Sequence, residues 1–119
     1  MAQGYTQRKV IDYTEVFSLV VKHTSIRVLM FIVAQFDWEL EQLNVKTAIL
    51  HGDLEEKILM TRPEGFKELE KEHLMCLLKK SLYGLKQSLR QWYKRFDNFI
   101  LKIHFKRSNY DGCFYYKKL

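Results

Sequence analysis

The sequence contains one proline, only two cysteines and no long hydrophobic run. Cys76 and Cys113 lie far apart, which excludes a disulfide framework and suits a reducing compartment. The longest apolar run, residues 28–34, is much shorter than the ~20 residues that a membrane span needs. Residues 1–9 contain no hydrophobic signal core. We therefore expect a cytoplasmic or nuclear protein that is not secreted and contacts no membrane.

The composition is that of a folded protein. Hydrophobic residues make up 47% of the chain and aromatic residues 14%, which is enough to build a core and excludes a disordered chain. The 119 residues correspond to one domain or part of one, because independent domains commonly have about 100–150 residues. No internal repeat, low-complexity tract or linker divides the sequence.

Acidic residues are scarce in the C-terminal part. Residues 1–73 contain 9 Lys and Arg against 12 Asp and Glu, whereas residues 74–119 contain 11 against 2. The C-terminal part therefore has a net charge of +9 together with many aromatic residues. This pattern is typical of a surface that faces a phosphate backbone. A solvated basic face without a partner explains the charge equally well, so charge alone leaves both interpretations open.

Helical spacing of apolar residues predicts two helices. The first covers residues 24–36, with Thr24 or Ser25 as N-cap. The second begins near Ser88, which we expect to be its N-cap. The apolar positions of the first helix are Ile26, Leu29, Met30 and Val33. Those of the second are Trp92, Phe96, Phe99, Ile100 and Ile103, which we interpret as core residues.

Strand patterns are shorter. We predict strands at residues 40–49, 58–61, 76–78 and 112–116, and an exposed loop at residues 64–73 after Pro63. The expected order is helix, strand, strand, strand, helix, strand. This order predicts an α+β domain, and its topology does not follow from the pattern.

Three stretches and the tail carry recognisable motifs. They are AQGYTQRKVIDYTEVFSLVVKHTSIR (residues 2–27), QLNVKTAILHGDLEEKILMTRPEGF (42–66), LKKSLYGLKQSLRQWYKRF (78–96) and SNYDGCFYYKK (108–118). Each resembles a stretch of the reverse transcriptase domain in the Pol polyprotein of copia-type LTR retrotransposons. The stretches follow one another in the family's order and cover nearly the whole chain.

The resemblance implies part of a right-hand polymerase, namely the fingers and the first part of the palm, with the catalytic hairpin and the thumb absent. Residues 1–36 would be fingers-like, and residues 37–66 would hold the first catalytic strand. Residues 67–119 would hold the template and nucleotide loop, a helix and the start of the next strand. A palm sheet without its central strands has exposed edges, so we expect self-association.

The family's chemistry depends on carboxylates. Nucleotidyl transfer uses two Mg²⁺ ions about 3.5–4 Å apart, and Mg²⁺ prefers anionic oxygen ligands. In this family one aspartate lies in a QLDV-like motif and two in a YVDD-like hairpin. Here the first position is Asn44, and no YVDD-like motif is present. Asp37, Glu39 and Glu41 alternate on the opposite face of the expected strand. We therefore expect no cofactor and no metal site in this chain.

The resemblance also implies a nucleotide pocket. The backbone amides of Thr47 and Ala48 would meet the triphosphate. Ile49 occupies the position of an aromatic residue that stacks under the sugar and rejects a 2′-hydroxyl. Tyr83 and Gly84 lie in the loop that shapes the nucleotide and template pocket, where glycine permits a close backbone approach.

Other departures suggest a decayed copy. Leu19 and Leu89 stand where the family has proline, and Asn44 stands where it has aspartate. Each change can arise by one C-to-T or G-to-A transition, as deamination of methylated cytosines would produce. The family's fingers extend upstream of Met1, so we expect the reading frame to begin within the domain.

Three functions remain as hypotheses. The first is a non-catalytic remnant of an RNA-directed DNA polymerase. The second is a nucleic-acid-binding module that contacts a template–primer. The third is an enzyme segment completed by a separate product that supplies the hairpin, which Asn44 would still impair. The cations that would contact nucleic acid are Lys79, Lys80, Lys86, Arg90, Lys94 and Arg95.

Overall fold

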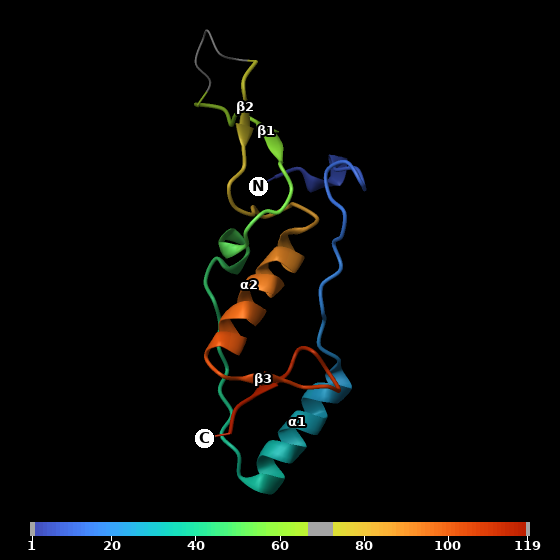
Figure 1. Ribbon diagram of the computed structural model, residues 1–119, viewed down its shortest axis with the longest axis vertical. Helices are drawn as coiled ribbons and strands as arrows, with labels where there is room; N and C mark the ends of the chain where they lie inside the picture. The colour runs from blue at the N-terminus through green and yellow to red at the C-terminus, as the bar shows by residue number, and fades with distance from the viewer. Residues whose placement is uncertain (1, 67–72, 119) are drawn as a thin grey trace.

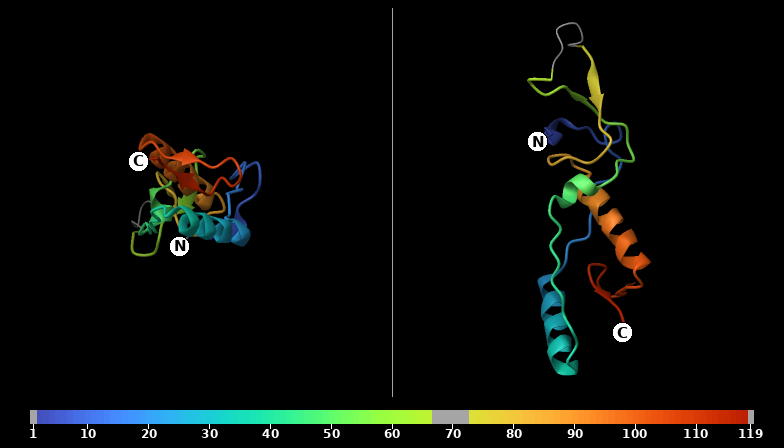
Figure 2. Two further views of the ribbon diagram at one scale, coloured as in Figure 1. Left: turned by 90° about the horizontal axis from the view of Figure 1, so that it is seen from below. Right: turned by 90° about the vertical axis from the view of Figure 1, so that its left-hand side faces the viewer.

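The chain is elongated along the axis that joins its two helices. The computed structural model describes residues 2–66 and 73–118, which extend over 66 × 25 × 22 Å (Figure 1). The Cα radius of gyration is 18.9 Å, against about 13.5 Å for a compact chain of this length. The paired strands β1 and β2 lie at one end, helix α1 lies at the other, and helix α2 lies between them, as Figure 1 and the right-hand view of Figure 2 show.

Helix α1 (His23–Phe36) confirms the first predicted helix. It ends at Asp37, whose left-handed backbone (φ 52°) lets its N–H donate to the carbonyl oxygen of Val33. The predicted caps Thr24 and Ser25 are wrong, because the helix already begins at His23 and both residues lie inside its first turn. A cap needs non-helical backbone, and here Lys22 provides it without a side-chain hydrogen bond.

Helix α2 (Ser88–Lys102) confirms the second predicted helix. Ser88 is its first residue and not its N-cap, because Gln87 holds the cap position and its carbonyl oxygen already accepts a hydrogen bond from the N–H of Gln91. The hydroxyl of Ser88 instead donates a hydrogen bond of 2.7 Å to the carbonyl oxygen of Leu82. The apolar face is only partly covered. Ile100 is buried, but Phe99 is 59% exposed and Ile103 is 38% exposed, so the prediction that both are core residues is wrong.

Two antiparallel strand pairs form the sheet part. Strands β1 (Leu59–Thr61) and β2 (Met75–Leu77) pair with Leu59 opposite Leu77, and confirm two predicted strands to within one residue. Strands β3 (Lys106–Arg107) and β4 (Tyr115–Tyr116) form a second hairpin that packs beside α2. Only the last two residues of the predicted strand 112–116 pair, and β3 is too short for alternation to predict it.

The predicted strand at residues 40–49 is wrong. Residues 38–45 have no regular structure, and residues 48–51 form the 3₁₀ turn η2 (Ala48–His51). A strand is stabilised by its neighbours, and no described segment pairs with this one. The predicted loop 64–73 lies mostly outside the described residues. The domain is thus a small mixture of helices and antiparallel strands, as the α+β prediction states.

The hydrophobic core is small. Ala2, Ile58 and Leu85 form its buried centre, where the N-terminal segment with the 3₁₀ turn η1 (Gly4–Thr6) meets the loop before α2. Helix α1 buries no residue, and Phe31 on its surface is 67% exposed. Self-association through exposed sheet edges stays a prediction. An open apolar groove of about 740 Å³ beside α1 is lined by Leu19, Val20, Val21, Ile26, Met30, Leu40, Leu43 and Phe114, among others.

Candidate functional site

The N-terminal segment holds the loop that precedes α2. The N–H of Ala2 donates a hydrogen bond of 2.8 Å to the carbonyl oxygen of Tyr83. Gly84 has a φ of 98°, which favours glycine, and the N–H of Leu85 returns to the carbonyl oxygen of Leu82. A Cβ on Gly4 would lie 1.7 Å from the carbonyl oxygen of Gly84. The first and third sequence motifs therefore contact each other through their backbones.

Buried glutamine side chains join the same two segments. Gln87 has no exposed surface, and its Oε1 accepts a hydrogen bond of 3.0 Å from Nε2 of Gln7. Its Nε2 donates to the carbonyl oxygen of Asp12 at 3.2 Å. The Oε1 of Gln7 in turn accepts from the N–H of Lys86 at 2.9 Å. Because the buried amide of Gln87 has a partner for both its oxygen and its nitrogen, these hydrogen bonds fix the position of the loop.

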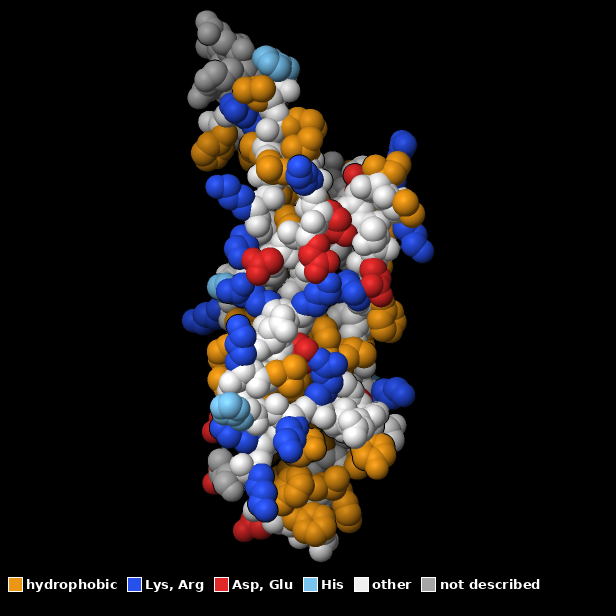
Figure 3. Space-filling model, viewed as in Figure 1, with side chains coloured by type: hydrophobic (Ala, Val, Ile, Leu, Met, Phe, Trp, Pro, Cys, Tyr) orange, Lys and Arg blue, Asp and Glu red, His pale blue; other side chains and the backbone are white. Residues whose placement is uncertain are grey.

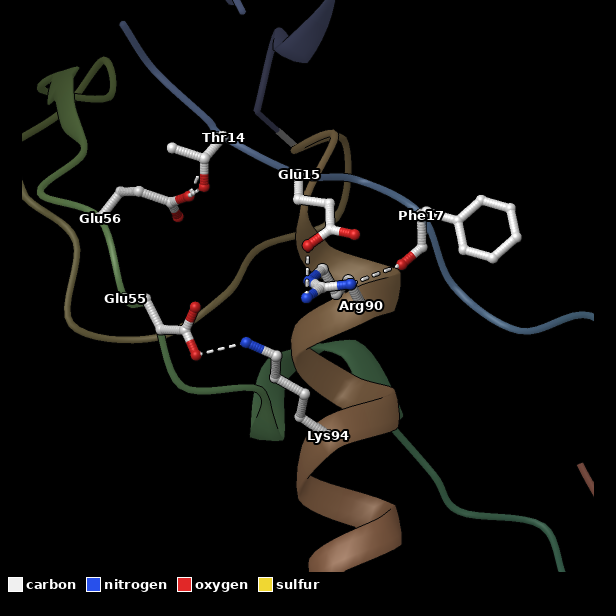
Figure 4. A network of polar contacts seen from close by, with 7 residues as sticks. All are labelled: Thr14, Glu15, Phe17, Glu55, Glu56, Arg90 and Lys94. Atoms are coloured by element: carbon white, nitrogen blue, oxygen red, sulfur yellow. Dashed lines mark hydrogen bonds and ion pairs between the residues drawn. The ribbon is translucent and has the colours of Figure 1, made fainter. Parts of the chain in front are cut away.

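Two cations of the predicted nucleic-acid set bind the N-terminal segment. The ammonium of Lys86 donates to the carbonyl oxygen of Gln7 at 2.9 Å and lies 5.2 Å from the ring centre of Tyr13. The guanidinium of Arg90 lies 2.6 Å from a carboxylate oxygen of Glu15 and donates to the carbonyl oxygen of Phe17 (Figure 4). Both cations thus attach residues 7–17 to the start of α2.

Three further cations bind the segment between η2 and β1. Lys94 lies 2.5 Å from a carboxylate oxygen of Glu55, and the two residues face each other across the open space in Figure 4. Asp53 binds two cations, because one of its oxygens pairs with Lys80 and the other lies 2.9 Å from Arg95. Asp53 therefore bridges the loop before α2 and the middle of the helix.

These contacts give five of the six predicted cations a partner within the chain. Their side chains are partly exposed, so solvent screens these ion pairs and each contributes little to stability. Lys79 has no carboxylate partner among the described residues. The structure assigns the five paired cations a clear role in holding the chain together, whereas their contact with nucleic acid stays a prediction.

The carboxylates of these pairs make stability depend on pH. The pKa of Asp53 is lowered, first by the hydrogen bond from Lys80, and the pKa of Glu55 is lowered, first by the hydrogen bond from Lys94. The pKa of Asp111 is lowered by the N–H of Cys113. A carboxyl with a lowered pKa stabilises the fold above its unfolded pKa, and this contribution is lost as the pH falls through its folded pKa.

We therefore expect the chain to lose stability below about pH 4, near and below the ordinary carboxyl values of 3.8 and 4.5. Urea unfolding between pH 7 and pH 3 measures this loss. Asp53→Asn should flatten the acid limb, whereas Glu64→Gln, at an exposed residue, should leave it unchanged. Equal curves for Asp53→Asn and the unaltered chain would contradict the assignment.

The predicted metal position lies in an irregular segment. Asn44 is exposed in the irregular segment between α1 and η2, so its predicted place in a strand is wrong. Without that strand, Asp37, Glu39 and Glu41 do not share a strand face. Thr47 has a left-handed backbone (φ 53°) and Ile49 is half-buried in η2. No hydrogen bond in the described residues links Asn44 with Tyr83 or Gly84.

Acidic side chains do not gather near Asn44. Within residues 2–66 and 73–118, no group of three or more His, Cys, Asp and Glu side chains is arranged to hold a metal ion. The described residues therefore do not fit the Mg²⁺ pair that the family resemblance implies.

No helix in the described ranges is long and apolar enough to cross a membrane.

Comparison with known proteins identifies the family. The model of the family "Reverse transcriptase (RNA-dependent DNA polymerase)" matches residues 1–119. The chain belongs to this family. A Pol polyprotein from the transposon TNT 1-94 of Nicotiana tabacum is 52% identical over 118 residues, which is 99% of this chain. A Pol polyprotein from the transposon RE1 of Arabidopsis thaliana is 42% identical over 108 residues, which is 91% of this chain.

These relatives assign the reverse transcriptase chain to the copia-type retrotransposon group, as its motifs indicate. A truncated Ty1-A Gag-Pol polyprotein of Saccharomyces cerevisiae is 28% identical over 86% of the chain. The chain spans 9% of the tobacco polyprotein, 7% of the Arabidopsis one and 8% of the yeast one. No solved structure matches.

Sequence reasoning missed the acceptors and carboxylates that hold the reverse transcriptase chain together. Gln7 and Gln87 are 80 residues apart, and Arg95 and Asp53 are 42 apart, so no local spacing indicates either contact. The only available signal was the charge imbalance, because a cationic C-terminal part and an acidic N-terminal part attract each other.

Proposed function

We propose that this chain is a reverse transcriptase segment that does not support metal-dependent nucleotidyl transfer. The observation that carries the proposal is Asn44, a neutral amide at the position where the family has an aspartate. An amide offers one uncharged oxygen, whereas Mg²⁺ prefers anionic ligands. Asp37 lies at the C-terminal end of α1. The carboxylates of the described residues form no group that could hold a metal ion in place of the missing aspartate.

The nucleotide pocket supports the same proposal. Ile49 would lie under the sugar of an incoming nucleotide, and a branched aliphatic side chain offers no ring face to stack there. In this proposal residues 1–36 correspond to the fingers, and residues 37–119 to the first part of the palm with its template loop and helix. Tyr83 and Gly84 would shape the pocket from the loop that the N-terminal segment holds.

The experiment that tests the proposal restores the carboxylate. An active copia-type reverse transcriptase receives residues 1–119 of this chain in place of its own matching segment, and primer extension is measured with Asn44 and with Asn44→Asp. A hybrid that extends primers equally well with either residue would overturn the proposal.

Nucleic-acid binding without catalysis is the second candidate. It is favoured by the net charge of +9 over residues 74–119, which remains after the two carboxylates of this part are subtracted from its 11 Lys and Arg residues. We expect the chain to bind a labelled oligonucleotide with an affinity that falls steeply as salt rises from 50 to 200 mM, because cations that contact phosphates release counterions. Fluorescence anisotropy measures the slope. Binding that is absent at 50 mM salt would rule this candidate out.

A further inference from the structure

The C-terminal hairpin has two chemically different faces. Strands β3 and β4 pair with Lys106 opposite Tyr116 and Arg107 opposite Tyr115. Residues directly opposite each other share a face, and successive residues alternate between faces. Arg107 and Tyr115 therefore lie on one face, and Lys106 and Tyr116 lie on the other.

The face of Arg107 and Tyr115 is turned to α2 and neutralised there. Arg107 forms an ion pair with Asp97 of α2, and the hydroxyl of Tyr115 donates to the same carboxylate at 2.8 Å. The rings of Tyr115 and Phe96 meet edge to face at 5.6 Å. Burial raises the pKa of Tyr115 and keeps its hydroxyl protonated. This face packs against the helix and carries no free charge.

The opposite face is exposed and cationic. Lys106, Tyr116 and Lys118 are exposed, and 51% of the surface of Tyr116 is open to solvent. Lys118 lies two residues beyond Tyr116, just after the end of β4. Lys102, in the last turn of α2, precedes Lys106 by four residues. We name Lys102, Lys106, Tyr116 and Lys118 the hairpin surface.

The charges of the hairpin surface have no partner in the described part of the chain. No ion pair there joins Lys102, Lys106 or Lys118 to a carboxylate. The two carboxylates of residues 74–118 have other partners: Asp97 pairs with Arg107, and Asp111 accepts the N–H of Cys113. This contrasts with the predicted cations of the loop and α2. Figure 3 shows Lys and Arg side chains at the level of β3 and the C-terminus, beside hydrophobic ones.

Unpaired cations beside an exposed aromatic ring match one ligand chemistry. Lysines attract the phosphates of a nucleic acid, and an exposed ring stacks on a base that is not held in a duplex. We propose that the hairpin surface binds single-stranded nucleic acid, with phosphates on Lys102, Lys106 and Lys118 and a base on Tyr116. This proposal rests on the proposed nucleic-acid binding and moves its site from the loop and α2 to the hairpin.

The test compares two variants of the full chain that lose the same charge. Lys102→Gln, Lys106→Gln and Lys118→Gln together neutralise the hairpin surface. The control combines Lys9→Gln, Arg27→Gln and Lys57→Gln, which are exposed residues elsewhere. Binding of a single-stranded oligonucleotide is measured by anisotropy at several salt concentrations, and circular dichroism verifies that each variant is folded.

We expect the hairpin variant to lose at least about tenfold in affinity and about 2 units of salt slope, since each single-strand phosphate contact contributes roughly 0.7. The control should lose much less. Tyr116→Ala, which changes no charge, should weaken single-strand binding on the order of tenfold and leave the salt slope unchanged.

Each result separates the two proposals. An unaltered chain that binds no oligonucleotide overturns nucleic-acid binding and the hairpin surface together. A chain that binds, but loses equal affinity in the hairpin and control variants, keeps the binding and overturns its location. If the chain binds a duplex more tightly than a single strand, and Tyr116→Ala leaves the affinity unchanged, then no base stacks on Tyr116 and the proposal is overturned.

Discussion

Asn44→Asp is expected to raise primer extension about 10³-fold in a hybrid polymerase that contains this chain. The change replaces a neutral amide by a carboxylate at the family's metal position, and metal ions stabilise the transferring phosphoryl group by several kcal/mol. Each 1.36 kcal/mol corresponds to a factor of ten in rate, so a lost metal ion accounts for about three such factors. The measurement is single-nucleotide extension on a template–primer with saturating Mg²⁺.

The control places the same new charge at a neighbouring position. Gln42→Glu adds a carboxylate two residues away, at an exposed residue, and should give no gain. A hybrid with the host enzyme's own segment verifies that the assay detects activity. If Asn44→Asp and Gln42→Glu give equal extension while that host enzyme is active, the loss of activity does not arise at Asn44.

Gly4→Ala is expected to destabilise the fold by about 1–3 kcal/mol, because its new Cβ would lie 1.7 Å from the carbonyl oxygen of Gly84. The positions of the new Cβ and of the carbonyl oxygen are both fixed by the backbone, so no side-chain rotamer change relieves the overlap. The N-terminal segment must then leave the loop, and the hydrogen bond from Ala2 to Tyr83 is lost. Urea unfolding measures the stability, and limited proteolysis measures the release of the segment.

Gln3→Ala is the matched control for this prediction. Gln3 is exposed, and its side chain only accepts a hydrogen bond from the hydroxyl of Tyr5 at 3.2 Å. We expect unfolding and proteolysis to remain within experimental error of the unaltered chain. A Gly4→Ala chain that is as stable and as resistant as Gln3→Ala would show that the contact between Gly4 and Gly84 does not hold the loop.

The helices were predictable because their information is local. The apolar spacing of Ile26 to Val33 specifies α1, and the observed helix differs from the prediction only at its first residue. Ser88 shows the limit of this reasoning. Its type and position favour an N-cap, but the helix begins one residue earlier and Gln87 holds the cap position. A cap prediction fails wherever the turn before the helix shifts the first helical residue.

The rest depends on partners that are distant in sequence. Apolar and polar residues alternate over residues 40–49 as they do in a strand. Alternation indicates which side chains would share a face, but it does not indicate whether a second strand is available to pair with this one. The basic residues in and before α2 were visible in the sequence, but the acceptors that bind them, Glu15, Asp53 and Glu55, lie 27 to 75 residues away. Sequence therefore predicted where the charge lies and missed what it binds.

The attachment of the N-terminal segment has a consequence for biosynthesis. Gln7 emerges from the ribosome early, but its partner Gln87 is 80 residues downstream. At about 5–20 residues per second, the segment waits on the order of 4–16 s before its binding site exists. Until then the hydrogen bonds that join Gln87 and Lys86 to the N-terminal segment cannot form, and proteases and chaperones compete for that segment. The N-terminal segment therefore reaches its folded contacts only after this chain has been synthesised as far as Gln87.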